Sequence, residues 1–226
     1  MDTWVIVEPE NDQHDRINNF LEDNIVGYSA NGVVNAEQFY RRQAAPLLPT
    51  NMAGVPYERI WRAAYDDQGY LLGAITTTLP YEMAIELGQG NMTYARGFLR
   101  ARRVIEGLAV REDVRGQGLG KALLQENESA AKRQKATLLV GFMDDANGSP
   151  FVYKSAGYSV VAHNRPLPPV GEFGLNERHP DDLNGHWFYK PIIQANTSRK
   201  YVAGILEAAK GYEGNEPEQQ PTTAGS

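Results

Sequence analysis

The feature that most constrains this chain is a glycine-rich turn at residues 115–121, which reads Arg-Gly-Gln-Gly-Leu-Gly-Lys. An apolar stretch at 103–110 predicts a strand before the turn, and helical spacing of apolar residues at 119–134 predicts a helix after it. The first turn of a helix has unpaired N–H groups and a partial positive charge, and glycine lets a ligand approach the backbone closely. The pattern therefore predicts an anion site where the strand meets the helix.

Two common nucleotide-binding motifs do not fit this turn. A P-loop requires glycine where Arg115 stands and Ser or Thr where Ala122 stands. A dinucleotide-binding turn that begins at Gly116 requires its third glycine where Lys121 stands. The spacing excludes both motifs, so the anion must be held in another way.

The order of strand, Arg-x-x-Gly-x-Gly and helix resembles the central motif of the GNAT superfamily of N-acetyltransferases, with Arg115, Gly118 and Gly120 at its defining positions. A second segment, 151–158, is similar to the late GNAT segment, in which Tyr-x-x-x-Gly is followed by an aromatic residue. The two motifs cover 105–158, and the order of the elements extends the resemblance to 60–192. The resemblance implies that acetyl-CoA is the cosubstrate, with its pyrophosphate at the turn.

The resemblance also implies which residues bind the cofactor. The backbone N–H groups of residues 108–110 would bind the oxygen of the reacting carbonyl, and Lys121 either assists the phosphates or faces solvent. Asn147 stands one residue closer to Tyr153 than the family pattern places its asparagine. The resulting set of cofactor-binding candidates is Leu108, Ala109, Val110, Arg115, Gly116, Gln117, Gly118, Leu119, Gly120, Lys121 and Asn147.

Acetyl transfer to an amine needs a base, because an alkyl amine with a pKa of about 10 is mostly protonated at neutral pH. Period-two alternation places Glu106 on one strand face with Leu108 and Val110, so we expect Glu106 to be the base. Tyr153 occupies the family position of the acid that protonates the departing thiolate. The alternatives are a salt-bridged or surface glutamate and a tyrosine that only packs.

The remaining patterns predict an α+β, or mixed α/β, domain with a central mixed sheet of six or seven strands flanked by helices. Residues 80–101 have no clear period and are expected to form a long loop or an extended strand. The other predicted elements are a strand at 3–7, helices at 11–25 and 36–45, a hairpin of 60–65 and 70–79, a strand at 136–143, a short helix capped by Ser149 and stopped by Gly157, and strands at 158–162 and 186–192.

The domain is expected to span residues 1–210, including a terminal helix at 196–210. The last segment, 211–226, is poor in apolar residues and rich in Gly, Pro, Glu, Gln and Thr, so we expect a disordered tail. A chain of 226 residues with 42% hydrophobic residues is sufficient for one such core.

Composition narrows the class of function. The absence of cysteine excludes disulfides, a thiol nucleophile and thiolate-bound metal, and the four histidines have no metal-ligand spacing, so no metal site is expected. A net charge of -6 argues against a nucleic-acid partner. There is no membrane-spanning apolar run and no signal-peptide pattern at the start, which together favour a cytoplasmic location.

The leading hypothesis is an N-acetyltransferase whose acceptor is a primary amine of a small molecule or peptide. The alternative is a non-catalytic module that binds acyl-CoA for regulation or interaction, and a third class is acylation of amines linked to nucleic acid. Acceptor identity is expected to depend on 11–45, 80–101 and 164–185, which carry no readable motif. The segment 164–185 is a candidate for a lid or a homodimer contact.

Overall fold

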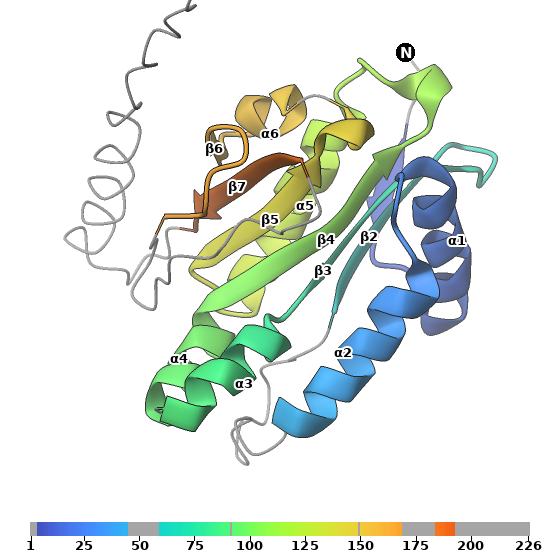
Figure 1. The fold of residues 1–226 in the computed structure, drawn as a ribbon. Coiled ribbons are helices and arrows are strands. Elements are labelled where there is room, and N and C mark those ends of the chain that lie inside the picture. Colours follow the sequence, from blue (N-terminus) through green and yellow to red (C-terminus); the bar gives the residue numbers. More distant parts are fainter. Residues whose placement is uncertain (1–3, 45–58, 91, 149, 169–183, 193–226) are drawn as a thin grey trace, which may run out of the picture.

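The computed structural model describes residues 4–44, 59–90, 92–148, 150–168 and 184–192, which form one sheet with helices on both faces (Figure 1). The strands are β1 Val5–Val7, β2 Ile60–Tyr65, β3 Leu71–Thr78, β4 Arg102–Val110, β5 Leu138–Asp144, β6 Ser159–Val160 and β7 Gly185–Pro191. The α-helices are α1 His14–Asn24, α2 Ala30–Ala44, α3 Tyr81–Gly90, α4 Met92–Ala101, α5 Leu119–Arg133 and α6 Phe151–Ser155. Short 3-10 helices are η1 Asn11–Gln13, η3 Glu112–Val114 and η4 Asp145–Asn147.

The seven strands lie in the order β1-β2-β3-β4-β5-β7-β6. Every pairing is antiparallel except that of β4 with β5, which α5 connects as a crossover helix. The parallel pairing joins 102–105 to 138–141 and extends no further among the described residues. The remaining half of β4 therefore separates from β5, and the sheet opens at that point.

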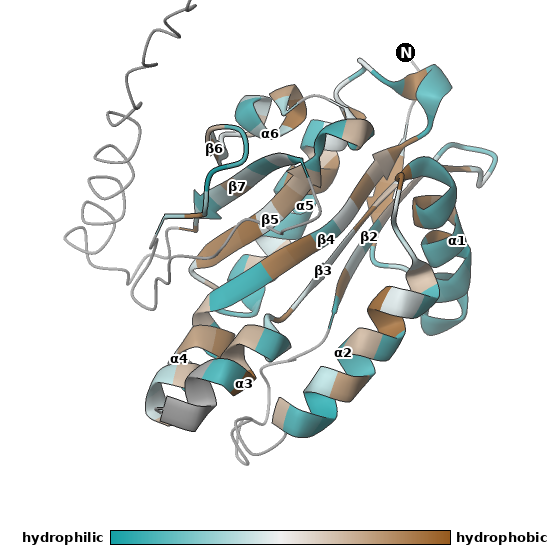
Figure 2. Ribbon diagram, in the orientation of Figure 1, coloured by the Kyte–Doolittle hydropathy of each residue, from teal (hydrophilic) through white to brown (hydrophobic). Residues whose placement is uncertain are grey.

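The two faces of the sheet have separate cores. Leu119, Leu123 and Leu124 of α5 pack with Ile75 and Ile105 on one face. Ile17 and Leu21 of α1 pack with Trp61, Ala74 and Ala109 on the other. Hydrophobic residues accordingly concentrate on the central strands, while hydrophilic residues lie on the outer sides of the helices (Figure 2). These cores confirm the predicted mixed sheet flanked by helices.

A β-bulge interrupts β4 at Glu106. Thr76 pairs with Gly107 but the next residue, Thr77, pairs with Ile105, so Glu106 is an extra residue in the register with β3. Leu108 and Val110 pack toward the α5 core, whereas Glu106 borders a cavity beneath α2 on the opposite face. The expectation that Glu106 shares a face with Leu108 and Val110 is therefore wrong, because a bulge re-aims the side chain that it inserts.

The segment 80–101 is not a loop or an extended strand, as the sequence analysis expected. It forms α3 and α4, which are inserted between β3 and β4 and pack on each other at the start of β4 (Figure 1). Their buried side chains join one satellite core with the end of α2, namely Ala44, Leu79, Tyr81, Ala84, Ala95, Phe98 and Leu99. Each helix has only ten residues, so no single period runs through the segment.

The other predicted elements match the structure with small shifts at their ends. The largest shift is in α2, which begins at Ala30 rather than at residue 36. Ser29 precedes it, and its Oγ accepts a hydrogen bond from the Gly32 amide at 3.2 Å, as an N-cap does. That serine was the signal that the helix prediction missed.

Several predictions lie outside the described residues. These are the Ser149 cap, the terminal helix at 196–210, the tail at 211–226 and most of the segment 164–185. Within the described residues, no helix has the length and apolar character needed to cross a membrane.

Candidate active site

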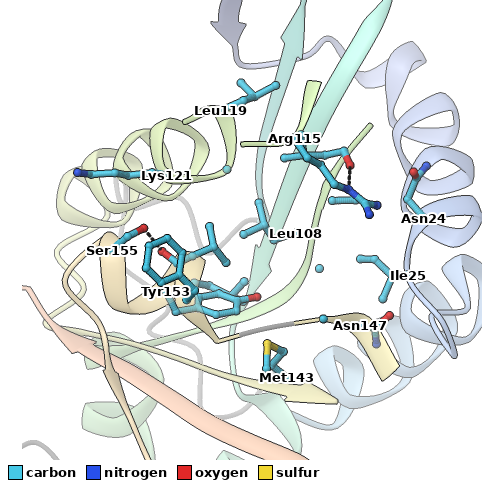
Figure 3. A pocket seen from close by; sticks show the side chains of 18 of the residues that line it. Asn24, Ile25, Leu108, Arg115, Leu119, Lys121, Met143, Asn147, Tyr153 and Ser155 are labelled. Carbon is cyan, nitrogen blue, oxygen red and sulfur yellow. Dashed lines mark hydrogen bonds between the residues drawn. The ribbon is translucent and has the colours of Figure 1, made fainter. Parts of the chain in front are cut away.

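A cavity of about 500 Å³ lies where β4 leaves β5 (Figure 3). The second half of β4, the glycine turn, α6, the end of β5 and the connection from α1 to α2 surround it. Of the predicted residues it is lined by Glu106, Leu108, Ala109, Val110, Arg115, Gly116, Gly118, Leu119, Gly120, Lys121, Asn147 and Tyr153. Gln117 is exposed and is not among the lining residues. We call this space the β4–β5 cavity.

The glycine turn has the backbone geometry of an anion site. Gly116 and Gly118 have φ values of 79° and 92°, in the left-handed region that favours glycine, and Gly118 is the N-cap of α5. The N-terminus of α5 therefore faces the cavity with its unpaired N–H groups. The Arg115 Nε donates to the Val110 carbonyl oxygen at 2.9 Å, which ties the turn back to β4.

Gly120 serves packing instead. A Cβ at this position would lie 3.1 Å from the Val152 Cγ2 on α6. Glycine therefore lets α5 and α6 approach closely, which brings α6 to the edge of the cavity. The same helix carries Tyr153.

Tyr153 is held rigidly at one wall of the cavity. Its side chain is 7% exposed and stacks on the Phe188 ring, with centroids 3.7 Å apart. Its hydroxyl points into the cavity (Figure 3). Burial raises the pKa of this phenol, so it remains protonated, and able to donate a proton, at neutral pH.

Glu106 lines the same cavity from the bulge of β4. Burial raises the pKa of its carboxyl; the Arg59 guanidinium opposes that rise and the Glu37 carboxylate adds to it. Arg59 is itself paired with Glu37, with its Nε and Nη2 at 2.7 and 2.5 Å from the Glu37 Oε2. A carboxyl whose pKa is raised toward neutrality is better matched to accept a proton near pH 7.

Asn147 makes a contact that the sequence did not suggest. Its Oδ1 accepts from the Val26 amide at 2.6 Å and its Nδ2 donates to the Val26 carbonyl at 3.1 Å. These bonds hold the connection between α1 and α2, including Ile25, beside the cavity (Figure 3). Asn147 thus organises the cavity wall, and direct binding of the cofactor by Asn147 stays a prediction.

A second cavity, of about 910 Å³, opens on the other side of Glu106. Its walls come from α2, α3, the end of β3, Arg59, Val104 and Trp187. We call it the α2–α3 cavity. Glu106 lines both cavities, so the bulge places one carboxyl where the two spaces meet.

The segments 11–45 and 80–101, which carry no readable motif, supply most of the lining of the α2–α3 cavity. The β4–β5 cavity is also lined by residues that were not predicted from the sequence, among them Asn24, Ile25, Met143 and Val152. Such scattered apolar and amide residues follow no regular spacing in the sequence. Of the described histidines, His14 stacks on Trp61, and the His163 Nε2 lies 2.7 Å from the Asp145 Oδ2. No cluster of metal-ligating side chains is present in the described residues.

Comparison with known proteins supports what the geometry indicates. Residues 57–160 match the family model for the acetyltransferase (GNAT) domain. No curated protein sequence matches the chain. Residues 57–160 therefore carry an acetyltransferase (GNAT) domain, and the sequence motifs and the mixed sheet agree with this family match.

Solved structures share the fold at low sequence identity. Phosphinothricin acetyltransferase from Sinorhizobium meliloti, solved with acetyl-CoA, has a TM-score of 0.52 and 12% identity over 87% of this chain and 92% of its own. Ard1 from Thermoplasma volcanium has a TM-score of 0.51 and 14% identity over 84% and 99% of the two chains. The N-acetyltransferase YhbS from Escherichia coli, solved with CoA, has a TM-score of 0.50 and 15% identity over 85% and 83%.

Proposed function

We propose that this protein transfers the acetyl group of acetyl-CoA to a primary amine. The observation that supports the proposal is that Glu106 and Tyr153 line the same cavity as the glycine turn. A base for the amine and an acid for the thiolate are the two proton-transfer groups that this reaction requires.

Acetyl-CoA is the cosubstrate, and the β4–β5 cavity suits its shape and charge. The pyrophosphate binds to the N–H groups at the turn of residues 115–121 and the start of α5. The pantetheine arm follows the second half of β4, which has no strand partner on the β5 side among the described residues. Backbone groups of residues 108–110 are thereby available to the arm and to the thioester oxygen.

The reaction follows from these positions. Glu106 takes a proton from the ammonium form of the acceptor, and the neutral nitrogen attacks the thioester carbonyl carbon. Backbone N–H groups of β4 stabilise the negative oxygen of the tetrahedral intermediate. The carbon–sulfur bond then breaks, and Tyr153 donates its proton to the departing thiolate. The product nitrogen loses its second proton to solvent, from which Tyr153 is reprotonated, and Glu106 releases its proton to solvent. The products are the N-acetylated amine and CoA with a free thiol.

The alternative is a module that binds acyl-CoA without turning it over. The raised pKa of Glu106 favours the enzyme, because a buried carboxyl is costly to keep and a binding module does not need one there. A third possibility, acylation of amines linked to nucleic acid, is disfavoured by the net charge of -6.

The test is incubation of the protein with acetyl-CoA and a panel of primary amines, with the released thiol and the acetylated amine both measured. The proposal predicts equal amounts of the two products. Tight CoA binding without turnover of any amine would support the binding module and refute the enzyme.

A further inference from the structure

We propose that the acceptor carries a second positive charge and that the α2–α3 cavity binds it. The inference rests on the proposed function and adds the chemical class of the acceptor. It begins from the size of the α2–α3 cavity, which at about 910 Å³ is far larger than a simple amine needs. The acceptor's body must occupy this space if its nitrogen reaches Glu106 from the side opposite the cofactor.

The cavity owes its shape to an insertion in the sheet. In place of a short turn between β3 and β4, the chain forms α3 and α4 and packs them against the end of α2. Tyr81 and Met83 of α3, Tyr40 of α2 and Trp187 of β7 line this space. These aromatic and apolar walls suit the hydrocarbon part of a ligand.

The charge of the lining is strongly unbalanced. Four glutamates line the cavity, Glu37, Glu82, Glu86 and Glu106, and among the described lining residues Arg59 is the one arginine or lysine. Arg59 is committed to Glu37, which also accepts from the Thr78 hydroxyl at 3.1 Å. One guanidinium among four carboxylates leaves three formal negative charges in the described lining to be balanced from elsewhere.

The remaining carboxylates have different positions along the cavity. Glu106 is at the junction with the β4–β5 cavity, where the reacting nitrogen must lie. Glu82 and Glu86 are one turn apart on α3 and so lie on the same side of that helix. The Tyr40 hydroxyl donates to the Glu82 Oε1 at 2.9 Å, which orients that carboxylate without neutralising it.

A ligand with one amine at Glu106 and a second cation shared by Glu82 and Glu86 places a positive charge beside each of these three carboxylates. A hydrocarbon spacer between the two charges matches the aromatic walls. Such a lining rejects acceptors that carry a carboxylate near the amine, because like charges repel at short range. The favoured class is therefore a diamine or a related amine with a distant cationic group.

The experiment compares linear diamines of increasing spacer length with monoamines of the same length, using the full chain and acetyl-CoA. We expect one range of diamine lengths to exceed its matched monoamine by about tenfold or more in kcat/KM, since each tenfold step corresponds to about 1.4 kcal/mol. Glu86→Gln and Glu82→Gln should reduce this diamine-to-monoamine ratio, mainly through KM for the diamine. Glu126→Gln, an exposed glutamate of α5 that lines neither cavity, should leave the ratio unchanged.

The outcomes separate this inference from the proposed function. Acetylation of monoamines and diamines with equal kcat/KM would overturn the inference and leave the acetyltransferase intact. Absence of turnover with every amine would refute the proposed function, and calorimetric binding of the diamine to the CoA-loaded protein would then decide the inference. Binding that weakens in the Glu82→Gln/Glu86→Gln variant supports it, while binding that is absent or unaffected by both substitutions overturns it. Unchanged melting temperatures would establish that the variants are folded.

Discussion

The two cavities that meet at Glu106 are built in different ways. Backbone dominates the β4–β5 cavity, through the half of β4 that has no described partner on its β5 side, left-handed glycines and the start of α5. Side chains dominate the α2–α3 cavity, with an ion-pair network and glutamates from an inserted helix. A backbone site suits a cofactor shared by a whole superfamily, whereas a side-chain site can change with the acceptor. Substitutions in each cavity separate cofactor binding from acceptor binding, and Glu106, which lines both cavities, has the largest expected effect.

Glu106→Gln should have the largest effect on catalysis. Loss of the base is expected to lower kcat/KM by about 10²–10⁴-fold, the usual range for general acid–base catalysis, with CoA affinity little changed. Steady-state kinetics and calorimetric titration with CoA measure the two quantities. A rate within a few-fold of wild type would exclude Glu106 as the base.

The same variant should be more stable at neutral pH. Burial raises the pKa of Glu106 in the folded protein, so wild type loses stability as pH rises from the unfolded-state pKa through the folded-state pKa. Glutamine has no charge to bury, and Glu106→Gln should melt at a higher temperature at pH 7 than wild type. The difference should vanish below about pH 4, where the carboxyl is neutral in both states.

Tyr153→Phe should lower turnover by about 10²-fold, the lower end of that same range, because the thiolate can also take a proton from water. The phenylalanine ring keeps the stack on Phe188, so fold and CoA affinity should be retained. Tyr158→Phe is the matched control, since Tyr158 is also buried against Phe188 but does not line the β4–β5 cavity. Equal losses in the two variants would mean that Tyr153 acts through packing alone.

Gly118→Val should weaken CoA binding by at least about tenfold, or about 1.4 kcal/mol. A branched side chain is disfavoured at a φ of 92° and would also crowd the phosphates. Gly69→Val places the same strain at a φ of 81° in the turn between β2 and β3, away from both cavities. If both variants retain wild-type CoA affinity, the glycine turn is not the pyrophosphate site.

The smallest effects should be opposite shifts in the pH profile. The rate falls in acid as Glu106 becomes protonated, and Arg59 lowers the pKa of Glu106 while Glu37 raises it. Arg59→Gln should therefore move the acidic limb of kcat/KM to higher pH, and Glu37→Gln should move it to lower pH. Shifts in the same direction would show that a different group controls this limb.

The difference between the cavities also explains what could be predicted from the sequence. Gly118 has a left-handed conformation in the turn, and Gly120 stands where α5 and α6 approach closely. Both positions are fixed in spacing relative to Arg115, so a sequence pattern could predict the candidate cofactor site. The α2–α3 cavity combines Glu37, Arg59 and Glu86 from distant segments, and no spacing relates them. The bulge at Glu106 was also hidden, because regular alternation of polar and apolar residues does not reveal an extra residue in the register.

We propose that Glu106 joins a cofactor site to an acceptor site. A structure of the protein with CoA and a linear diamine tests this claim most directly. We expect CoA phosphates at residues 115–121, one amine within hydrogen-bonding distance of the Glu106 carboxylate and the other amine near Glu82 and Glu86. An amine bound outside the α2–α3 cavity, or CoA bound away from the turn, would contradict it.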